Sequence, residues 1–253
     1  PPRDLRHSAA ADADLPRARA LVATRLGVGA DSVFFTADAT LAINHVLRGT
    51  VRPLDHVLVD NRAHSAVTRT LHNLDVEWSS CDFVGLDERL RIEALLTALR
   101  TNTRLVVLTH ASNVSGAVYA LEPVIATLRA LRPELAIAID ACQSAGLFPL
   151  APLATADFLV FSGHKALHGL PGAAVLVARR PLRPFVFGGT GVRSNDDEQR
   201  HPEHHHLEVG TPNLPAILAL AAVVDEAARE FESFRSAVAA RVRQLWDGLE
   251  GHP

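Results

Sequence analysis

The chain of 253 residues is long enough for one large domain or two ordinary ones, and 48% of its residues are hydrophobic, which is ample for a buried core. The formal net charge is −3, and no basic block or basic segment interleaved with aromatic residues is present, which argues against nucleic-acid binding. The longest apolar run, residues 216–224, is too short to cross a bilayer, and no signal peptide is visible. We therefore expect a cytoplasmic protein without a membrane segment.

The cysteine and histidine content argues against a metal site. Cys81 and Cys142 form no CxxC motif and are too few for a disulfide scaffold or a thiolate site. The histidine patch, His201 and residues 204–206, lies in a polar segment and lacks the i, i+4 spacing of good ligands. We predict no bound metal.

Seven apolar runs predict buried strands, and helical patterns separate most of them. The predicted strands are residues 33–35, 56–59, 76–79, 105–108, 135–139, 158–161 and 173–178. After a polar, Ala-rich arm over residues 1–14, the predicted helices are residues 15–26, 40–47, 65–74, 88–99 with Asp87 as cap, 121–131 and 217–249, and residues 181–212 are typical of a loop. This alternation predicts an α/β fold with a mostly parallel or mixed sheet between helices.

Polar side chains follow the predicted strands repeatedly. They are Thr36 and Thr40, His64, Asn113, Asp140 and Gln143, and residues 162–165. Because the carboxyl ends of parallel strands meet at one edge of a sheet, where open α/β folds bind ligands, we expect one ligand site there.

Lys165 ends the segment Phe161-Ser162-Gly163-His164-Lys165, directly after a buried strand. Lysine is rarely buried without a partner, and a desolvated amine loses its proton and becomes nucleophilic. Such an amine suits imine formation with a carbonyl group. The alternative is an ordinary surface lysine on a turn.

The strand ends together suit an aldehyde cofactor, pyridoxal 5′-phosphate (PLP), held as an imine on Lys165. Asp140 would pair with the pyridine nitrogen, Gln143 would donate to the phenolic oxygen, and His64 would stack on the ring. Amide groups near Ala39 and Thr40, together with the side chains of Ser162 and His164, would hold the phosphate.

Each of these residues also has a simpler explanation. Asp140 could cap a helix, Gln143 and His64 could be surface residues, and Asn113 could lie in a turn with Gly116. The segment before Ala39 could be plain helix capping.

The chain resembles the cysteine desulfurase and selenocysteine lyase family of class V aminotransferase-type proteins. The matching stretches are residues 35–44, 109–116, 140–146, 161–165, 188–191 and 208–213, in family order. The spacing of Asp140-x-x-Gln143 and Ser162-Gly163-His164-Lys165 is the most specific part of the resemblance.

The resemblance implies the PLP-dependent transferase fold of type I, with residues 1–212 as the PLP-binding large domain. Residues 213–253 would be a long interdomain helix and the start of a small domain that is largely absent from this chain. It makes Lys165 the Schiff-base lysine and places Asn113 against substrate or ring. Thr190 would reach the phosphate of a neighbouring subunit, which implies a homodimer with shared active sites.

The implied activity is removal of sulfur from L-cysteine, or of selenium from selenocysteine, with a sulfur-acceptor protein as partner. Family members carry a carboxylate-binding arginine and, in desulfurases, a persulfide cysteine beyond the long helix, and neither Cys81 nor Cys142 matches that cysteine. Ala37, Asp38 and Ala63 also depart from the family pattern. Two alternatives stay open: another class V aminotransferase or C–S lyase, and an inactive PLP-fold partner protein.

Overall fold

The structure, a computed structural model, describes residues 6–83, 91–189 and 206–250. The described residues form a seven-stranded sheet in the order β1-β7-β6-β5-β4-β2-β3. The strands are β1 (Val33–Thr36), β2 (His56–Asp60), β3 (Glu77–Cys81), β4 (Thr103–Thr109), β5 (Ala136–Asp140), β6 (Phe158–Ser162) and β7 (Ala174–Ala178). Strands β2 to β6 pair in parallel, whereas β7 is antiparallel to both β1 and β6. The prediction of a mostly parallel α/β sheet is confirmed.

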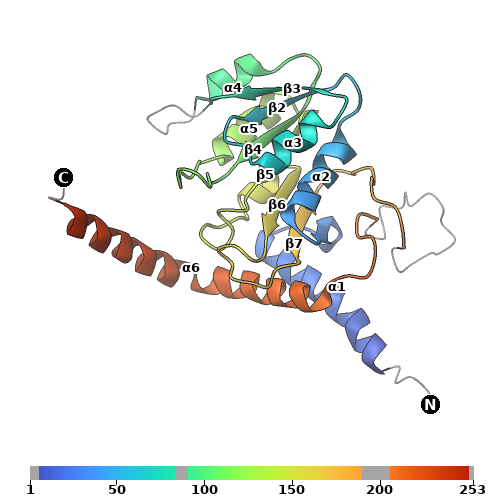
Figure 1. The fold of residues 1–253 in the computed structure, drawn as a ribbon, viewed down its shortest axis with the longest axis vertical. Coiled ribbons are helices and arrows are strands. Elements are labelled where there is room, and N and C mark those ends of the chain that lie inside the picture. The colour runs from blue at the N-terminus through green and yellow to red at the C-terminus, as the bar shows by residue number, and fades with distance from the viewer. Residues whose placement is uncertain (1–5, 84–90, 190–205, 251–253) are drawn as a thin grey trace.

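Helices cover both faces of this sheet (Figure 1). They are α1 (Arg6–Leu26), α2 (Ala39–Thr50), α3 (Ser65–His72), α4 (Ile92–Ala98), α5 (Glu122–Leu131) and α6 (Leu214–Leu249), with short 3-10 helices at Ala30–Ser32 and Leu153–Thr155. None of the described helices combines the length and the apolar composition that crossing a bilayer would require.

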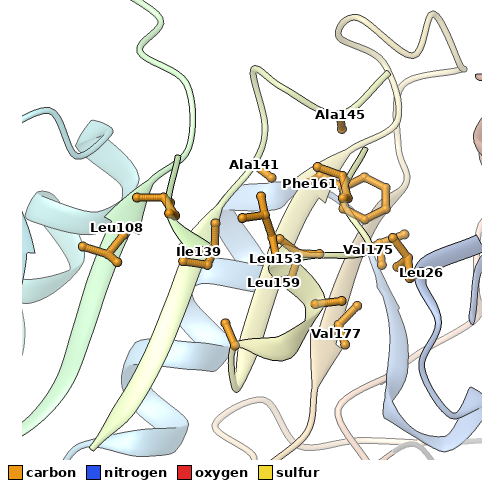
Figure 2. Packing of buried hydrophobic residues seen from close by; sticks show 14 of the residues in the cluster. Leu26, Leu108, Ile139, Ala141, Ala145, Leu153, Leu159, Phe161, Val175 and Val177 are labelled. Atoms are coloured by element: carbon orange, nitrogen blue, oxygen red, sulfur yellow. The ribbon is translucent and has the colours of Figure 1, made fainter. Parts of the chain in front are cut away.

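Alternate residues of the central strands enter two separate hydrophobic clusters. In β5, Ile137 and Ile139 pack in the cluster that contains residues of α1, α4, α5 and α6, whereas Ala136 and Ala138 pack in the cluster with α2 and α3. Figure 2 shows the first cluster, with Leu26 of α1 beside the strands. Because the central strands are buried on both faces, their sequences are continuous apolar runs, and the strand predictions are correct to within two residues at each end.

The helix predictions are less exact at the two ends of the chain. The predicted arm over residues 1–14 is wrong for residues 6–14, because α1 begins at Arg6. This segment is rich in alanine, which has the highest intrinsic helix propensity, and Pro16 lies inside the helix without ending it. Helix α6 begins at Leu214, where Asn213 caps it by accepting the N–H of Ala216 at 3.4 Å. The predicted cap Asp87 lies outside the described residues.

Helix α6 has two different halves. Its first half is packed in the core through Ala216, Ile217, Leu220, Ala221 and Val224. Its second half extends away from the sheet (Figure 1) and exposes large apolar side chains: Phe234, Val238, Val242, Leu245, Trp246 and Leu249.

Candidate active site

The carboxyl ends of β4, β5 and β6 and the first turn of α2 border a cavity of about 190 Å³, called here the sheet-edge cavity. It is lined by Asp38, Ala39, Thr40, Ile43, His64, Ala66, Thr109, Ala111, Asn113, Asp140, Cys142, Gln143, Ser162, His164 and Lys165. Every predicted site residue lines this cavity except Thr190, which lies outside the described residues. A second cavity, of about 180 Å³, lies against α6 and has a mostly apolar lining, so it offers little for polar chemistry.

Lys165, the single lysine of the 253 residues, is half-buried in a turn that follows β6. The turn is closed by backbone bonds from Gly163 to Ala173 (3.1 Å) and from Gly169 to Gly163 (2.8 Å). A Cβ atom on Gly163 would lie 2.8 Å from the Leu220 side chain of α6, so a larger residue here would force Leu220 to shift. Gly163 and Leu167 anchor the turn in the core, whereas Lys165 is half-buried and lines the cavity.

Asp140 is the last residue of β5, with 8% of its surface exposed. Its Oδ1 atom accepts the N–H of Cys142 at 3.0 Å. The register of the sheet places Thr109 of β4 directly beside Asp140, and the N–H of His110 donates to the Asp140 carbonyl at 3.0 Å. The carboxylate is therefore held at the cavity by backbone geometry.

Ser162 brings a buried hydroxyl group to the cavity. Its side chain is 1% exposed, and its Oγ atom has no hydrogen-bond partner among the described residues. A buried hydroxyl group without a partner costs roughly 1–3 kcal/mol, so such groups are rare unless a ligand or water satisfies them. Ser162 lines the sheet-edge cavity, which is where such a partner would bind.

Helix α2 begins at the rim of the cavity. Asp38 caps the helix by accepting the N–H of Leu41 at 2.8 Å, and its carbonyl accepts the N–H of Ala42 at 3.2 Å. The first amide groups of a helix have no intrahelical partners, so those of Ala39 and Thr40 suit an anion. The capping explanation of this turn and the anion-site explanation are both consistent with the structure.

His64 lies at the N-cap of α3 and is exposed at the cavity. Its Nδ1 atom accepts the N–H of Ala66 at 3.1 Å, so in the neutral ring the proton is on Nε2. Asn113 and His164 are exposed cavity residues, and Gln143 is half-buried. Thr36, another strand-end residue, instead donates to the Asp38 carbonyl at 2.8 Å and lines a neighbouring cavity.

Two buried polar residues near the site, His110 and Asp60, were not singled out from the sequence, and the neighbouring Cys142 is also buried. His110 has a ring Nδ1 atom 2.7 Å from the Ser144 Oγ atom, and burial lowers its pKa. Burial, together with the Asp140 charge, raises the pKa of the Cys142 thiol well above its usual value. Asp60, the last residue of β2, is 1% exposed. Asp60 obeys the same strand-end rule as Asp140, so the sequence did contain a signal for it.

The described residues contain no group of three or more His, Cys, Asp or Glu side chains that could hold a metal ion. Of the histidine patch, His206 is described: it is buried, and its Nε2 atom lies 2.9 Å from the Leu182 carbonyl. His201, His204 and His205 lie outside the described residues.

Comparisons with known proteins identify a family, and several of the matching proteins are described as cysteine desulfurases. A family model described as aminotransferase class-V matches residues 3–251. Cysteine desulfurase 2 of Trichormus variabilis is 29% identical over 257 residues, which cover 94% of this chain and 60% of that protein. The apo structure of a cysteine desulfurase from Thermococcus onnurineus NA1 has a TM-score of 0.82 and 25% identity, covering 96% of this chain and 64% of that one.

The cystine C–S lyase C-DES, solved in complex with its reaction product cysteine persulfide, has a TM-score of 0.86. It is 21% identical, over all of this chain and 71% of that one, which shows the fold alone. The chain spans 47% to 62% of the length of its curated relatives.

Proposed function

Because the chain belongs to the class-V aminotransferase family, we propose that it binds PLP in the sheet-edge cavity and removes sulfur from L-cysteine, or selenium from selenocysteine. One observation carries the proposal: a lysine, a strand-end carboxylate and a helix N-terminus converge on one cavity. The partnerless Ser162 hydroxyl group supports a polar ligand at this place.

The residues of the cavity fit the parts of the cofactor. Lys165 Nζ is the group that would bond its aldehyde carbon, and Asp140 would pair with its ring nitrogen. Gln143 would donate to the phenolic oxygen, and His64 would stack on the ring. The phosphate would be held by the α2 amide groups at Ala39 and Thr40 and by the side chains of Ser162 and His164.

When bound, the cofactor supplies a ring that stabilises negative charge at the Cα atom of an amino acid. The carboxylate of Asp140 would keep a proton on the ring nitrogen by accepting its N–H, which preserves the electron-withdrawing charge. The amine of Lys165 would serve as the base that takes the Cα proton. The cap bond from Ala66 fixes the ring of His64 in one orientation at the cavity.

A second activity, that of a C–S lyase without a persulfide cysteine, is favoured by the state of Cys142. This is the cysteine of the cavity lining, and it is 5% exposed with a raised pKa, so it makes a poor sulfur acceptor. A desulfurase would therefore need an acceptor cysteine other than Cys142, and it would pass sulfur to an acceptor protein.

We also propose the organisation that the resemblance implies. Residues 1–212 would form the PLP-binding domain, and residues 213–253 would join it to a small domain. The protein would be a cytoplasmic homodimer in which Thr190 reaches the partner's phosphate site. The apolar side chains exposed on the second half of α6 support a further packing partner for this helix.

The test begins with absorbance of the full-length protein after PLP addition. We expect a visible band in the parent protein and in Leu170→Ala, a control on the exposed part of the same turn. Lys165→Ala should lose the band, and borohydride reduction of the parent should attach the cofactor mass to the peptide that contains Lys165. A parent protein without the band contradicts cofactor binding.

Incubation with L-cysteine then separates the activities. Transfer of sulfur to an acceptor thiol with formation of alanine supports the desulfurase, and formation of pyruvate and ammonia supports the lyase. A protein that keeps the band but releases no product from cysteine or selenocysteine contradicts both activities and fits a partner subunit without turnover.

A further inference from the structure

Asp60 connects the turn that carries His64 to the strand that carries Thr109. Its Oδ1 atom accepts the N–H of Arg62 at 2.6 Å, and its Oδ2 atom accepts the N–H of Thr109 at 2.6 Å. Its backbone carbonyl also accepts the N–H of Ala63 at 3.0 Å. Both oxygens of one carboxylate are therefore bonded to the backbone of two different segments at the edge of the cavity.

The carboxylate acts where the two strands separate. The backbone pairing of β2 with β4 ends at Val59 and Val107, before the cavity is reached. Beyond this point the N–H of Thr109 donates to the side chain of Asp60. In a continued pairing of the two strands, it would donate to a backbone carbonyl of β2 instead. On its other side, Thr109 pairs with Asp140 of β5. Hydrogen bonds thus connect the turn before His64 to Asp60 and Asp60 to Thr109, and the next residue, His110, donates its N–H to the Asp140 carbonyl at 3.0 Å.

Only aspartate suits this place chemically. Two N–H donors need two acceptor oxygens, and an asparagine would set its own NH₂ group against one of them. The side chain is 1% exposed, and burial raises the pKa of its carboxyl group despite the hydrogen bonds and the nearby charge of Arg62. A buried carboxylate is unfavourable in itself, so its bonds are what hold it there.

We infer that Asp60 is a positioning residue of the sheet-edge cavity. It fixes the position of His64 relative to the ends of β4 and β5, where Thr109 and Asp140 lie. The inference rests on the function proposed above, because His64 and Asp140 are two of the residues that would contact the cofactor. Asp60 does not line the cavity, so it acts through its neighbours.

Asp157 provides a matched control at the opposite edge of the sheet. It is also buried, at 5% exposed, and its Oδ2 atom accepts the N–H of Ile137 at 2.8 Å, while Arg129 and Arg180 pair with it. It precedes β6 at the amino edge, so Asp157→Asn disturbs a buried carboxylate without touching the cavity.

The experiment compares Asp60→Asn with Asp157→Asn in the full-length protein. We expect Asp60→Asn to weaken PLP binding by about tenfold and to reduce the induced circular dichroism of the bound cofactor. Asp157→Asn should stay within about twofold of the parent Kd, although it lowers the thermal stability. Asp60→Ser, which keeps one acceptor, should fall between the parent and Asp60→Asn. Parent-like binding in Asp60→Asn, or equal weakening in both asparagine variants, overturns the inference.

Hydrogen exchange of the apoprotein gives a readout that needs no cofactor. Asp60→Asn should speed amide exchange in residues 61–66 and 109–113 together, whereas Asp157→Asn should leave both segments unchanged. Unchanged exchange in Asp60→Asn overturns the inference even if PLP does not bind. Failure of the proposed function is distinguished separately, by a parent protein without the Lys165-dependent band.

Discussion

At the scale of single residues, Ser162 and Ser144 are both buried but differ in hydrogen bonding. The buried hydroxyl group of Ser162 lacks a partner among the described residues, whereas the equally buried Ser144 hydroxyl group is bonded to His110 at 2.7 Å. A partnerless group contributes nothing favourable to the apoprotein, and removing it can be neutral or stabilising. The Ser144 hydroxyl group therefore stabilises the fold, whereas the Ser162 hydroxyl group is available to a ligand.

We predict that Ser162→Ala leaves the free energy of unfolding of the apoprotein unchanged or raises it by up to about 1 kcal/mol, while PLP binding weakens. The control Ser144→Ala should lower that free energy by about 1 kcal/mol because His110 loses its partner. Urea unfolding and PLP titration measure the two effects. A large loss of stability in Ser162→Ala would contradict the assignment of this hydroxyl group to a ligand.

Prediction at the scale of residues relied on one rule: polar residues at strand ends stand out against apolar runs. The rule selected Lys165, Asp140, Gln143 and His64, and the structure brings their side chains to one cavity. Asp60 was missed although it ends a strand, because a single aspartate there is equally typical of a turn. The missing partner of Ser162 could not be predicted, since it depends on atoms that surround the side chain in space.

At the scale of elements, α1 is held to the sheet and to the segment before α6 by one buried ion pair. Arg19 donates to both oxygens of Glu208 at 2.7 and 2.8 Å, and Glu208 also accepts the N–H of Phe35 at 2.6 Å. A second pair, Arg25 with Asp225, joins α1 to α6 at a more exposed place. Both pairs join α1 to the region of α6, but the Arg19–Glu208 pair is buried and the Arg25–Asp225 pair is more exposed.

We predict that Glu208→Gln lowers the free energy of unfolding by about 3 kcal/mol, because it leaves the Arg19 guanidinium group buried without a counter-charge. Asp225→Asn should lower it far less than Glu208→Gln does, since water screens the exposed pair. Urea unfolding of both variants measures the difference. Equal losses would show that depth does not decide the contribution of these pairs.

At this scale, the sequence did not predict the direction of β7, the start of α1 or the contact between Gly163 and α6. The run at residues 173–178 predicted a strand, but nothing in it distinguishes the antiparallel course of β7 from a parallel one. The start of α1 was missed because residues 6–14 lack an apolar stripe, although their alanine content favours a helix. The glycine at position 163 was read as part of a motif, whereas its contact with α6 explains it physically.

At the scale of the whole molecule, buried histidines make the fold sensitive to acid. His45 is 1% exposed, and burial, followed by the influence of His206, lowers its pKa from 6.5 to about 4. Burial also lowers the pKa of His56 and of His110. Between pH 6.5 and about 4, the unfolded chain binds a proton at His45 that the folded chain does not, so the fold loses stability as the pH falls.

We predict that the free energy of unfolding decreases from pH 7 to pH 4.5, with His45 contributing about 2 kcal/mol of the loss. His45→Leu should flatten this dependence, because the orphaned ring nitrogen and its proton are both removed. His168→Asn, at an exposed histidine with a positive φ of 57°, is the control and should keep the parent slope. Urea unfolding at several pH values measures the free energy of unfolding of the parent protein and of both variants. An unchanged slope in His45→Leu would contradict the assignment.

The exposed second half of α6 carries a tryptophan, Trp246, whose fluorescence reports on its surroundings. The 253 residues contain two tryptophans: Trp246 is 67% exposed near the end of α6, and Trp78 is half-buried against the His72 ring at 5.0 Å. Emission from Trp246 should therefore be typical of an indole in water until something covers the helix. A shift of that emission to shorter wavelength, on dilution or addition of other polypeptides, would reveal when the apolar side of α6 becomes enclosed.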